Sequence, residues 1–185
     1  MEPIITYRNY YENLPENWVS IALSNICEVK GGKRIPAGRK FSISATKHKY
    51  LRVTDMKNLT IRSCAYIDDD IFELIKNYTI NYNNIYITVA GTIGEVGLIP
   101  IEYDGANLTE NADKLLLNDA INKNWFLLFL QSEQCQKQIR ESMTKVGQPK
   151  LAIKRIESII VHLPPIKVQE LIFNKTNYLL KYLND

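Results

Sequence analysis

Side chains that carry catalysis or bind metals are scarce in this chain of 185 residues. It has two histidines, His48 and His162, and three cysteines at positions 27, 64 and 135, with no Cys-x-x-Cys pair. An odd, scattered set of cysteines argues against a disulfide framework and against a zinc site. Neither histidine has a serine or cysteine partner in a recognisable catalytic context. We therefore expect buried structural cysteines, no metal and no cofactor.

Long apolar runs are also missing. No stretch approaches the ~20 residues that cross a membrane, and the N-terminus lacks the basic-then-apolar pattern of a secretion signal. The hydrophobic share of 45% is ordinary for a globular chain and sufficient for the core of one domain. We expect no membrane association and a cytoplasmic location.

A nucleotide-binding motif is missing too. Glycines 91, 94 and 97 form a Gly-x-x-Gly-x-x-Gly run. A dinucleotide site needs Gly-x-Gly-x-x-Gly between a strand and a helix, and a P-loop needs Gly-Lys-Ser/Thr. The residues after Gly94 alternate and are β-branched, so they indicate a strand. We expect these glycines to serve a turn or a close approach of backbone.

One acidic cluster leaves an alternative function open. Glu110, Asp113 and Lys114 faintly resemble the acid-acid-lysine cluster of a metal-dependent nuclease. The cluster has no second acidic anchor before Glu110, so we predict no catalysis by this chain. A metal-dependent DNA nuclease is kept as an alternative.

Acidic residues are absent from two basic segments. Val29 to Thr54 contains eight basic residues and no acid, and Met143 to Arg155 contains four basic residues and no acid. The net charge is only +3, so the rest of the chain is net acidic. Such segregation is expected of a nucleic-acid binder. A protein-interaction module whose basic loops bind an acidic partner remains possible.

Hydrophobic periodicity predicts a mixed α/β chain. Ile85, Ile87 and Val89 alternate with polar positions, which predicts a strand with one buried face, paired in a hairpin with residues 96–101. Further strands are expected at 18–23, 26–30, 50–53, 64–67, 114–117 and 158–163. Helices are expected at 68–78, with Ile71, Leu74 and Ile75 on its stripe, at 124–143, 151–156 and from 166 to the end.

The last helix carries an apolar stripe of Val168, Ile172, Leu179 and Leu183. A helix of ~18 residues is marginal alone, so packing must stabilise it. We expect this stripe to pair with an antiparallel helix, from the missing half of a longer subunit or from a second copy of the chain.

Six short motifs follow one another in order: Leu14-Pro15-Glu16-Asn17-Trp18, Gly31-Gly32, the segment 84–94, the segment 106–111, Gly147-Gln148-Pro149-Lys150-Leu151 and the segment 163–170. Together they resemble the target recognition domain of type I restriction-modification specificity (S) subunits, over nearly the whole chain. The Leu163-Pro164-Pro165 entry to a helix, with Gln169, is the most specific motif.

The resemblance implies an α/β (α+β) recognition domain with a strongly curved mixed β-sheet and flanking helices, followed by a long C-terminal spacer helix. It implies a lead-in at 1–13, the domain at 14–163 and the start of the spacer at 164–185. It also implies a non-catalytic chain that reads one half of a bipartite double-stranded DNA target. The implied partners are methyltransferase (M) subunits and, through them, restriction (R) subunits.

Two departures from the family pattern stand out. Family members usually carry two recognition domains and this chain carries one, so it is an excised half or a half-subunit that dimerises; the lead-in favours excision. A Gly-Gly-Thr-Pro turn is frequent in the family, whereas Lys33-Arg34-Ile35 separate Gly32 from Pro36 here.

Base reading needs side chains that present donors and acceptors, which Arg34, Arg39, Asn107, Asn111 and Gln148 offer. Basic side chains contact phosphate. The residues expected to contact DNA are Lys30, Gly31, Gly32, Lys33, Arg34, Arg39, Lys40, Lys47, Lys49, Arg52, Thr92, Asn107, Thr109, Asn111, Lys145, Gln148, Lys150 and Lys154.

Overall fold

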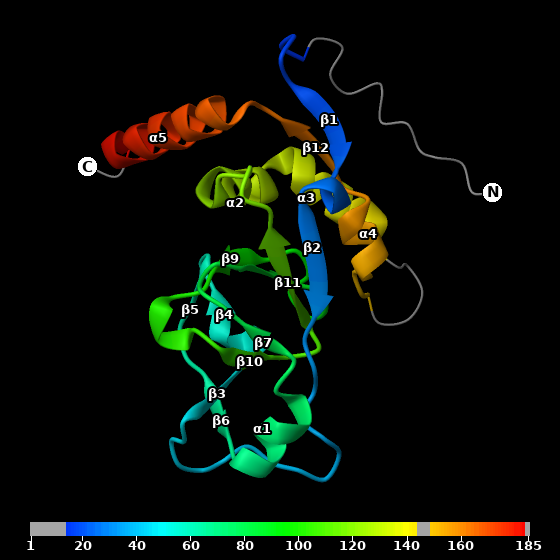
Figure 1. The fold of residues 1–185 in the computed structure, drawn as a ribbon, viewed down its shortest axis with the longest axis vertical. Coiled ribbons are helices and arrows are strands. Elements are labelled where there is room, and N and C mark those ends of the chain that lie inside the picture. Colours follow the sequence, from blue (N-terminus) through cyan, green and yellow to red (C-terminus); the bar gives the residue numbers. More distant parts are fainter. Residues whose placement is uncertain (1–13, 144–148, 184–185) are drawn as a thin grey trace, which may run out of the picture.

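The computed structural model describes residues 14–143 and 149–183 of the chain, and Figure 1 shows its elements. The strands are β1 (Val19–Ala22), β2 (Cys27–Gly31), β3 (His48–Leu51), β4 (Met56–Lys57), β5 (Thr60–Ile61), β6 (Ala65–Ile67), β7 (Thr79–Ile80), β8 (Ile85–Thr88), β9 (Val96–Leu98), β10 (Ala106–Leu108), β11 (Ala112–Leu117) and β12 (Ile160–Leu163). The helices are α1 (Asp69–Ile75), α2 (Lys123–Gln131), α3 (Glu133–Ser142), α4 (Ile153–Glu157) and α5 (Ile166–Leu183). Short 3-10 turns are η1 (Leu23–Asn25), η2 (Val53–Asp55) and η3 (Ile101–Tyr103).

Two four-stranded sheets form the body of the molecule. The central sheet has the order β2-β11-β8-β9 with every neighbouring pair antiparallel. The second sheet has the order β6-β3-β10-β7, in which β3 and β10 are parallel and the other pairs antiparallel. Two small antiparallel pairs, β1-β12 and β4-β5, complete the strands. The predicted mixed α/β class with a C-terminal helix is confirmed.

The molecule is elongated, with α1 at one end and α2, α3 and α5 toward the other (Figure 1). The main core lies between the central sheet and helices α2, α3 and α4, and includes the stacked rings of Trp125 and Phe129. A second core lies between the two sheets, and a third packs the second sheet against α1. The central sheet therefore has a hydrophobic cluster on each face.

The predicted hairpin is present, because β8 pairs with β9 in the register Ile85–Leu98 to Ile87–Val96. The expectation of one buried face is wrong: all four residues of β8 are buried. Ile85 and Ile87 belong to the main core, whereas Tyr86 belongs to the second core and donates a hydrogen bond to the Thr60 carbonyl oxygen at 3.2 Å. A strand at the centre of a sheet covered on both sides buries its polar positions as well.

A close approach of backbone explains why one of the three glycines in the hairpin, Gly97, is a glycine. A Cβ atom there would lie 2.4 Å from the carbonyl carbon of Leu59 and 2.5 Å from the Tyr86 hydroxyl. The neighbouring Leu98 amide donates a hydrogen bond to the Leu59 carbonyl oxygen at 3.0 Å. The close approach is thus between β9 and the β4–β5 hairpin of the same chain.

The predicted single helix over 124–143 is two helices. Ser132 interrupts it with φ −61° and ψ 148°, an extended conformation that ends α2 and begins α3. The Ser132 hydroxyl accepts a hydrogen bond from the Cys135 amide at 3.3 Å, as a serine N-cap does. The apolar stripe continues across the break, so periodicity alone does not reveal it.

The other predicted elements occur close to their expected places, and β4, β5, β7 and β10 were not predicted. In α1, Ile71 and Ile75 are buried as expected, but Leu74 is 61% exposed and does not belong to the buried stripe. No helix within residues 14–143 and 149–183 combines the length and apolar character that crossing a membrane requires.

Asp113 is an unusual buried side chain of the central sheet. It stands opposite Gly31 and Ile87, it is 4% exposed, and its Oδ2 atom has no hydrogen-bond partner among the described residues. Burial raises the pKa of Asp113 to about 6, against a lowering by the charge of Lys150. Because the folded chain holds this proton more tightly than the unfolded chain, the free energy of unfolding falls as the pH rises from about 4 to about 6.

Asp113→Asn should remove this loss. The free energy of unfolding of the variant, relative to wild type, should increase by roughly 3 kcal/mol between pH 4 and pH 7, since about two pKa units correspond to that energy. Urea denaturation at both pH values measures it. Asp119→Asn, at an exposed turn position, is the matched control. A difference for Asp113→Asn that stays constant with pH contradicts the argument.

Candidate nucleic-acid interface

Residues 32–47, here called the basic loop, connect β2 to β3 and contain no helix or strand. The loop begins where Gly32 lies directly on β10: a Cβ atom at Gly32 would be 2.1 Å from the Thr109 carbonyl oxygen and 2.4 Å from that of Leu108. The Lys33 amide donates to the Leu108 carbonyl oxygen at 2.8 Å. Only glycine allows this approach, so the start of the loop is fixed against the second sheet.

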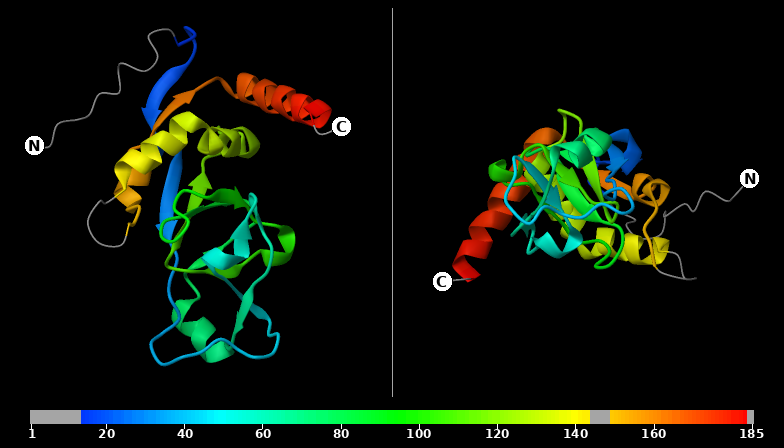
Figure 2. Two further views of the ribbon diagram at one scale, coloured as in Figure 1. Left: turned by 180° about the vertical axis from the view of Figure 1, so that it is seen from behind. Right: turned by 90° about the horizontal axis from the view of Figure 1, so that it is seen from below.

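The rest of the basic loop passes around α1 at the lower end of the molecule (Figures 1 and 2). The Ser42 amide donates to the Tyr66 carbonyl oxygen at 2.8 Å, and the Thr46 hydroxyl donates to that of Ile67 at 2.7 Å. The Phe41 ring lies against Tyr50 with ring centroids 5.2 Å apart. Contacts with β3 and β6 thus hold the loop along its length, although it lacks regular structure.

Acids from other segments neutralise part of the basic loop. Arg39 pairs with Asp70 at 2.6 Å and Lys47 with Asp69 at 3.2 Å, both in the first turn of α1. Arg34 pairs with Glu110 at 2.5 Å. The basic segment contains no acid in the sequence, but folding brings acids from distant positions onto the loop.

These ion pairs lie at the surface. The side chains of Arg39 and Asp70 are each about half exposed, and those of Lys47 and Asp69 are 71% and 74% exposed. Hydrogen bonds from Lys47 and His48 lower the pKa of Asp69. Exposed pairs of this kind contribute little to stability because solvent screens them, so a phosphate group can replace the carboxylate at little cost.

Other basic side chains of the predicted site have partners within the chain. Lys30 pairs with Glu28 and Lys154 with Glu157, each at 2.9 Å. Lys33 lies 5.7 Å from the ring centroid of Tyr78.

Lys49 donates to the Glu102 carbonyl oxygen and lies 5.3 Å from the Tyr103 ring centroid. Arg52 makes a two-pronged contact with the buried carboxylate of Asp55, at 2.9 and 2.8 Å, and so has a structural task. Lys40 and Lys150 are exposed.

Two residues predicted to contact DNA are in the interior. Asn107 is 1% exposed and donates from Nδ2 to the Ile75 carbonyl oxygen at 2.8 Å. Thr109 is 5% exposed and donates to Glu110 Oε2 at 3.0 Å. Neither side chain is accessible to DNA in this structure, because Asn107 lies on β10, an inner strand of the second sheet, and Thr109, directly after β10, is buried as well.

The remaining predicted contact residues are scattered. Asn111 is half-buried, and its carbonyl oxygen accepts from the Val89 amide at 2.8 Å. Thr92 is exposed in the turn after β8, away from the basic loop in sequence. Gly31 is the last residue of β2. Lys145 and Gln148 lie outside the described residues.

The nuclease cluster is not assembled. Asp113 and Lys114 are neighbours in β11, so their side chains point to opposite faces of the sheet. Lys114 donates to the Thr79 carbonyl oxygen, whereas Asp113 is buried and Glu110 is paired with Arg34. In the part of the chain that the structure describes, no group of three histidine, cysteine or acidic side chains is placed to hold a metal ion.

Sequence reasoning missed two features of the loop. At the end of the loop, His48 begins β3; it stacks on Phe72 with ring centroids 3.8 Å apart and contacts Asp69 at 2.8 Å, so it joins the start of β3 to α1. Ile43 is fully exposed at a bend of the loop, and residues 42–44 are here called the apex. The only sequence signal for Ile43 was that an apolar residue stands in a segment without periodicity.

The predicted stripe of α5 is divided. Ile172 packs against the main core and Val168 is half-buried, whereas Leu179 and Leu183 are 52% and 80% exposed. Gln169 is buried and fixes the start of the helix: its Oε1 accepts from the Asn122 amide at 2.8 Å and its Nε2 donates to the Pro164 carbonyl oxygen at 2.9 Å. The expectation that all four stripe residues face a partner is thus corrected for Ile172.

Comparisons with known proteins agree with this fold. No curated protein matches the sequence. A chain from a structure of complex assembly and conformational transition in the type I R-M system is similar over 95% of this chain and 41% of its own, with TM-score 0.76 and 14% identity. The HsdS subunit from Thermoanaerobacter tengcongensis (TM-score 0.69, 14% identity, 95% of this chain and 40% of its own) is also similar. The type I restriction-modification S subunit from M. genitalium is similar too, with TM-score 0.62 and 15% identity over 94% of this chain and 41% of its own.

This chain therefore spans about 40% of the length of these structures, and at such identities the likeness shows the fold alone. A family model matches most of the chain's own sequence. The model of the type I restriction modification DNA specificity domain matches residues 15–184, so the chain belongs to that family.

Proposed function

We propose that this chain reads one half of a bipartite duplex DNA target for a type I restriction-modification complex, and that the basic loop is its main DNA contact. The observation that carries the proposal is the ordered basic loop, whose cations are held by exposed, weak ion pairs. In a domain of a DNA specificity family, such cations are suited to phosphate.

DNA binding would exchange partners within the basic loop. Arg39 and Lys47 would leave the carboxylates of α1 for phosphate oxygens, and the released counterions would drive association. Lys40 has no ion-pair partner among the described residues, so it would contact phosphate without giving up a pair. The first turn of α1 then competes with DNA for the same cations.

The proposal assigns no chemistry to this chain. Methyl transfer and cleavage would belong to the methyltransferase subunits and, through them, the restriction subunits. A metal-dependent nuclease is disfavoured by the opposite orientations of Asp113 and Lys114. A module for an acidic protein differs in one measurable way, because it would treat DNA and other polyanions alike.

We further propose that the C-terminal part of α5 packs against a helix from a second recognition half or a second copy. Five large side chains there are half to four-fifths exposed: Tyr178, Leu179, Leu180, Tyr182 and Leu183. At 100° per residue these positions cover more than half of the helix circumference. A helix apolar over so wide an arc is normally buried, and Figure 2 shows α5 projecting away from the sheets.

The salt dependence of DNA binding tests the basic loop. Removing one phosphate contact should weaken binding to all duplexes and reduce the slope of log K against log salt by about one. We expect this for Lys40→Ala and for Lys47→Ala, measured on the chain assembled in its complex. Asp69→Asn, which frees Lys47, should instead tighten binding.

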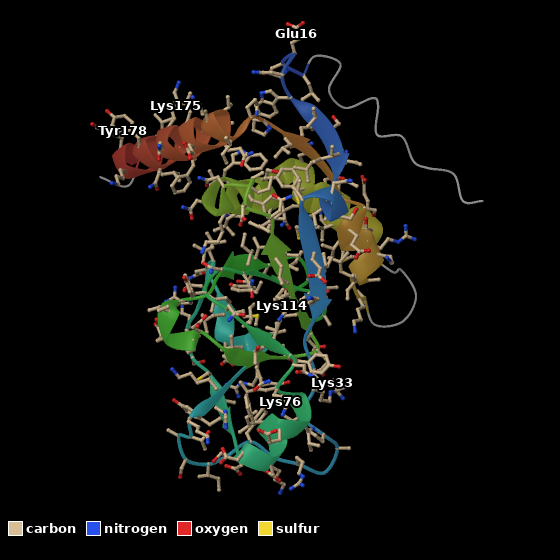
Figure 3. The ribbon with its side chains drawn as sticks, in the orientation of Figure 1. Glu16, Lys33, Lys76, Lys114, Lys175 and Tyr178 are labelled. Carbon is tan, nitrogen blue, oxygen red and sulfur yellow. The ribbon has the colours of Figure 1, made fainter. Side chains whose placement is uncertain are left out.

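Lys175→Ala is the matched control. It removes the same charge from α5, at the opposite end of the molecule from Lys33 and α1 (Figure 3), and should leave the slope unchanged once assembly has been verified. Equal slopes for wild type and both loop variants would contradict the assignment of the loop. Equal binding to DNA and heparin would favour the acidic-protein alternative.

Leu179→Glu combined with Leu183→Glu tests the helix. The double variant should lose dimerisation or assembly with methyltransferase subunits, measured by analytical ultracentrifugation. Its free energy of unfolding should stay within about 0.5 kcal/mol of wild type, because both side chains are exposed.

Two controls bracket this result. Asn177→Glu, on the polar side of the same turn, should assemble normally, whereas Ile172→Glu should destabilise the domain, since Ile172 packs on the main core. A double variant that unfolds, or that assembles like wild type, refutes the proposed role of this face.

A further inference from the structure

Ile43 is the most exposed large hydrophobic residue that the structure describes. Its relative exposure of 104% equals that of an isolated residue, and Leu183 follows at 80%. A single exposed isoleucine needs no explanation by itself. Its setting on the basic loop is what makes Ile43 informative.

The residues on both sides of Ile43 are fixed. The Ser42 amide is bonded to the Tyr66 carbonyl oxygen, and Thr46 is bonded to Ile67 at 2.7 Å. Phe41, two positions before Ile43, turns inward to Tyr50 and has the Arg52 guanidinium 5.8 Å from its ring centroid. The loop therefore packs the Phe41 ring against Tyr50, which leaves Phe41 36% exposed, and leaves the Ile43 side chain entirely in solvent.

The charge around Ile43 indicates the nature of its partner. Arg39 and Lys40 precede it and Lys47 follows it. Asp70 and Asp69 of α1 pair with Arg39 and Lys47 through exposed contacts that phosphate would replace, and Lys40 adds a further positive charge. A polyanion would approach this apex, and its phosphates would meet these cations. Among polyanions, duplex DNA is the one that also offers an apolar group within reach of a bound loop.

That apolar group is the C5-methyl of thymine. An isoleucine side chain has neither donor nor acceptor, so in the major groove it can recognise only this methyl group. The hydroxyls of Ser42 and Ser44 flank it and can bond to either base of a pair. The wider major groove accommodates such a three-residue apex better than the minor groove does.

An intercalating wedge is the competing use of an exposed isoleucine. Unstacking a base step costs about as much free energy as burying one isoleucine side chain regains, so a wedge needs the further contacts that a bent duplex provides.

We propose that Ile43 is a specificity-determining residue that contacts the C5-methyl group of a thymine in the major groove of the half-target. This inference rests on the function proposed above, and it adds the base that the apex of the loop recognises. It requires at least one A·T pair in the half-target.

The test is a double-mutant cycle between the protein and the DNA. The assembled complex first selects its target from random duplexes. Each thymine of the half-target is then replaced in turn by deoxyuridine, which lacks only the methyl group, and the dissociation constant is measured. Wild type should lose about fourfold in affinity at one position, the effect of one buried methyl group.

Ile43→Ala should bind the unmodified target several-fold more weakly and should be insensitive to deoxyuridine at that same position. Ile101→Ala is the matched control, because Ile101 is 69% exposed on η3 and lies outside the basic loop. It should keep the wild-type response at every position. Both variants change exposed side chains, so their thermal unfolding should match wild type.

The outcomes separate this inference from the proposed function. A selection that enriches no duplex overturns both. An enriched half-target without an A·T pair overturns the role of Ile43 alone. So does a result in which the affinity losses from Ile43→Ala and from deoxyuridine add up at every position. An increase in 2-aminopurine fluorescence on binding that Ile43→Ala removes would indicate a wedge, and it also overturns the methyl contact.

Discussion

The contact of Gly32 with the backbone of Leu108 and Thr109 is the constraint on which the candidate interface depends. It brings the end of β2, in the central sheet, against β10, in the second sheet. The amides of Gly32 and Lys33 extend this junction by donating to Ala112 and Leu108. The basic loop therefore leaves the body of the domain from a rigid point where two sheets meet, and a side chain at position 32 would separate them.

From that point, electrostatics and hydrogen bonds determine where the loop lies. The acids of α1 hold Arg39 and Lys47 in place, and β6 holds Ser42 and Thr46. The hydrogen bonds to backbone are specific and persist, whereas the exposed ion pairs are weak and can be exchanged. This combination gives an ordered loop whose charges remain available, which reduces the entropy lost when DNA binds.

Much of the fold could be predicted where the pattern is long. The hairpin of β8 and β9 followed from alternation, and α5 followed from its apolar stripe and the prolines before it. Strands of two or three residues such as β4 and β7 are too short for a period to be read. The break at Ser132 escaped because a serine N-cap looks the same as an exposed serine within a helix.

The site was less predictable than the fold, because it depends on contacts between distant segments. Asn107 and Thr109 are polar, and nothing local reveals that β10 is an inner strand. The acid-free run could not show that Asp69 and Asp70 lie against it. Ile43 gave no periodic signal. Its importance arises only because its neighbours Ser42 and Thr46 are bonded to β6 while its own side chain is fully exposed.

The central claim is that the basic loop is the surface that meets DNA. Hydroxyl-radical footprinting of the assembled complex, with and without its target duplex, tests it most directly. The account predicts that labelling of residues 39–47 falls sharply when the duplex binds, while Ile101, exposed elsewhere, is labelled equally in both states. Unchanged labelling of residues 39–47, together with protection of another surface of the domain, would contradict it.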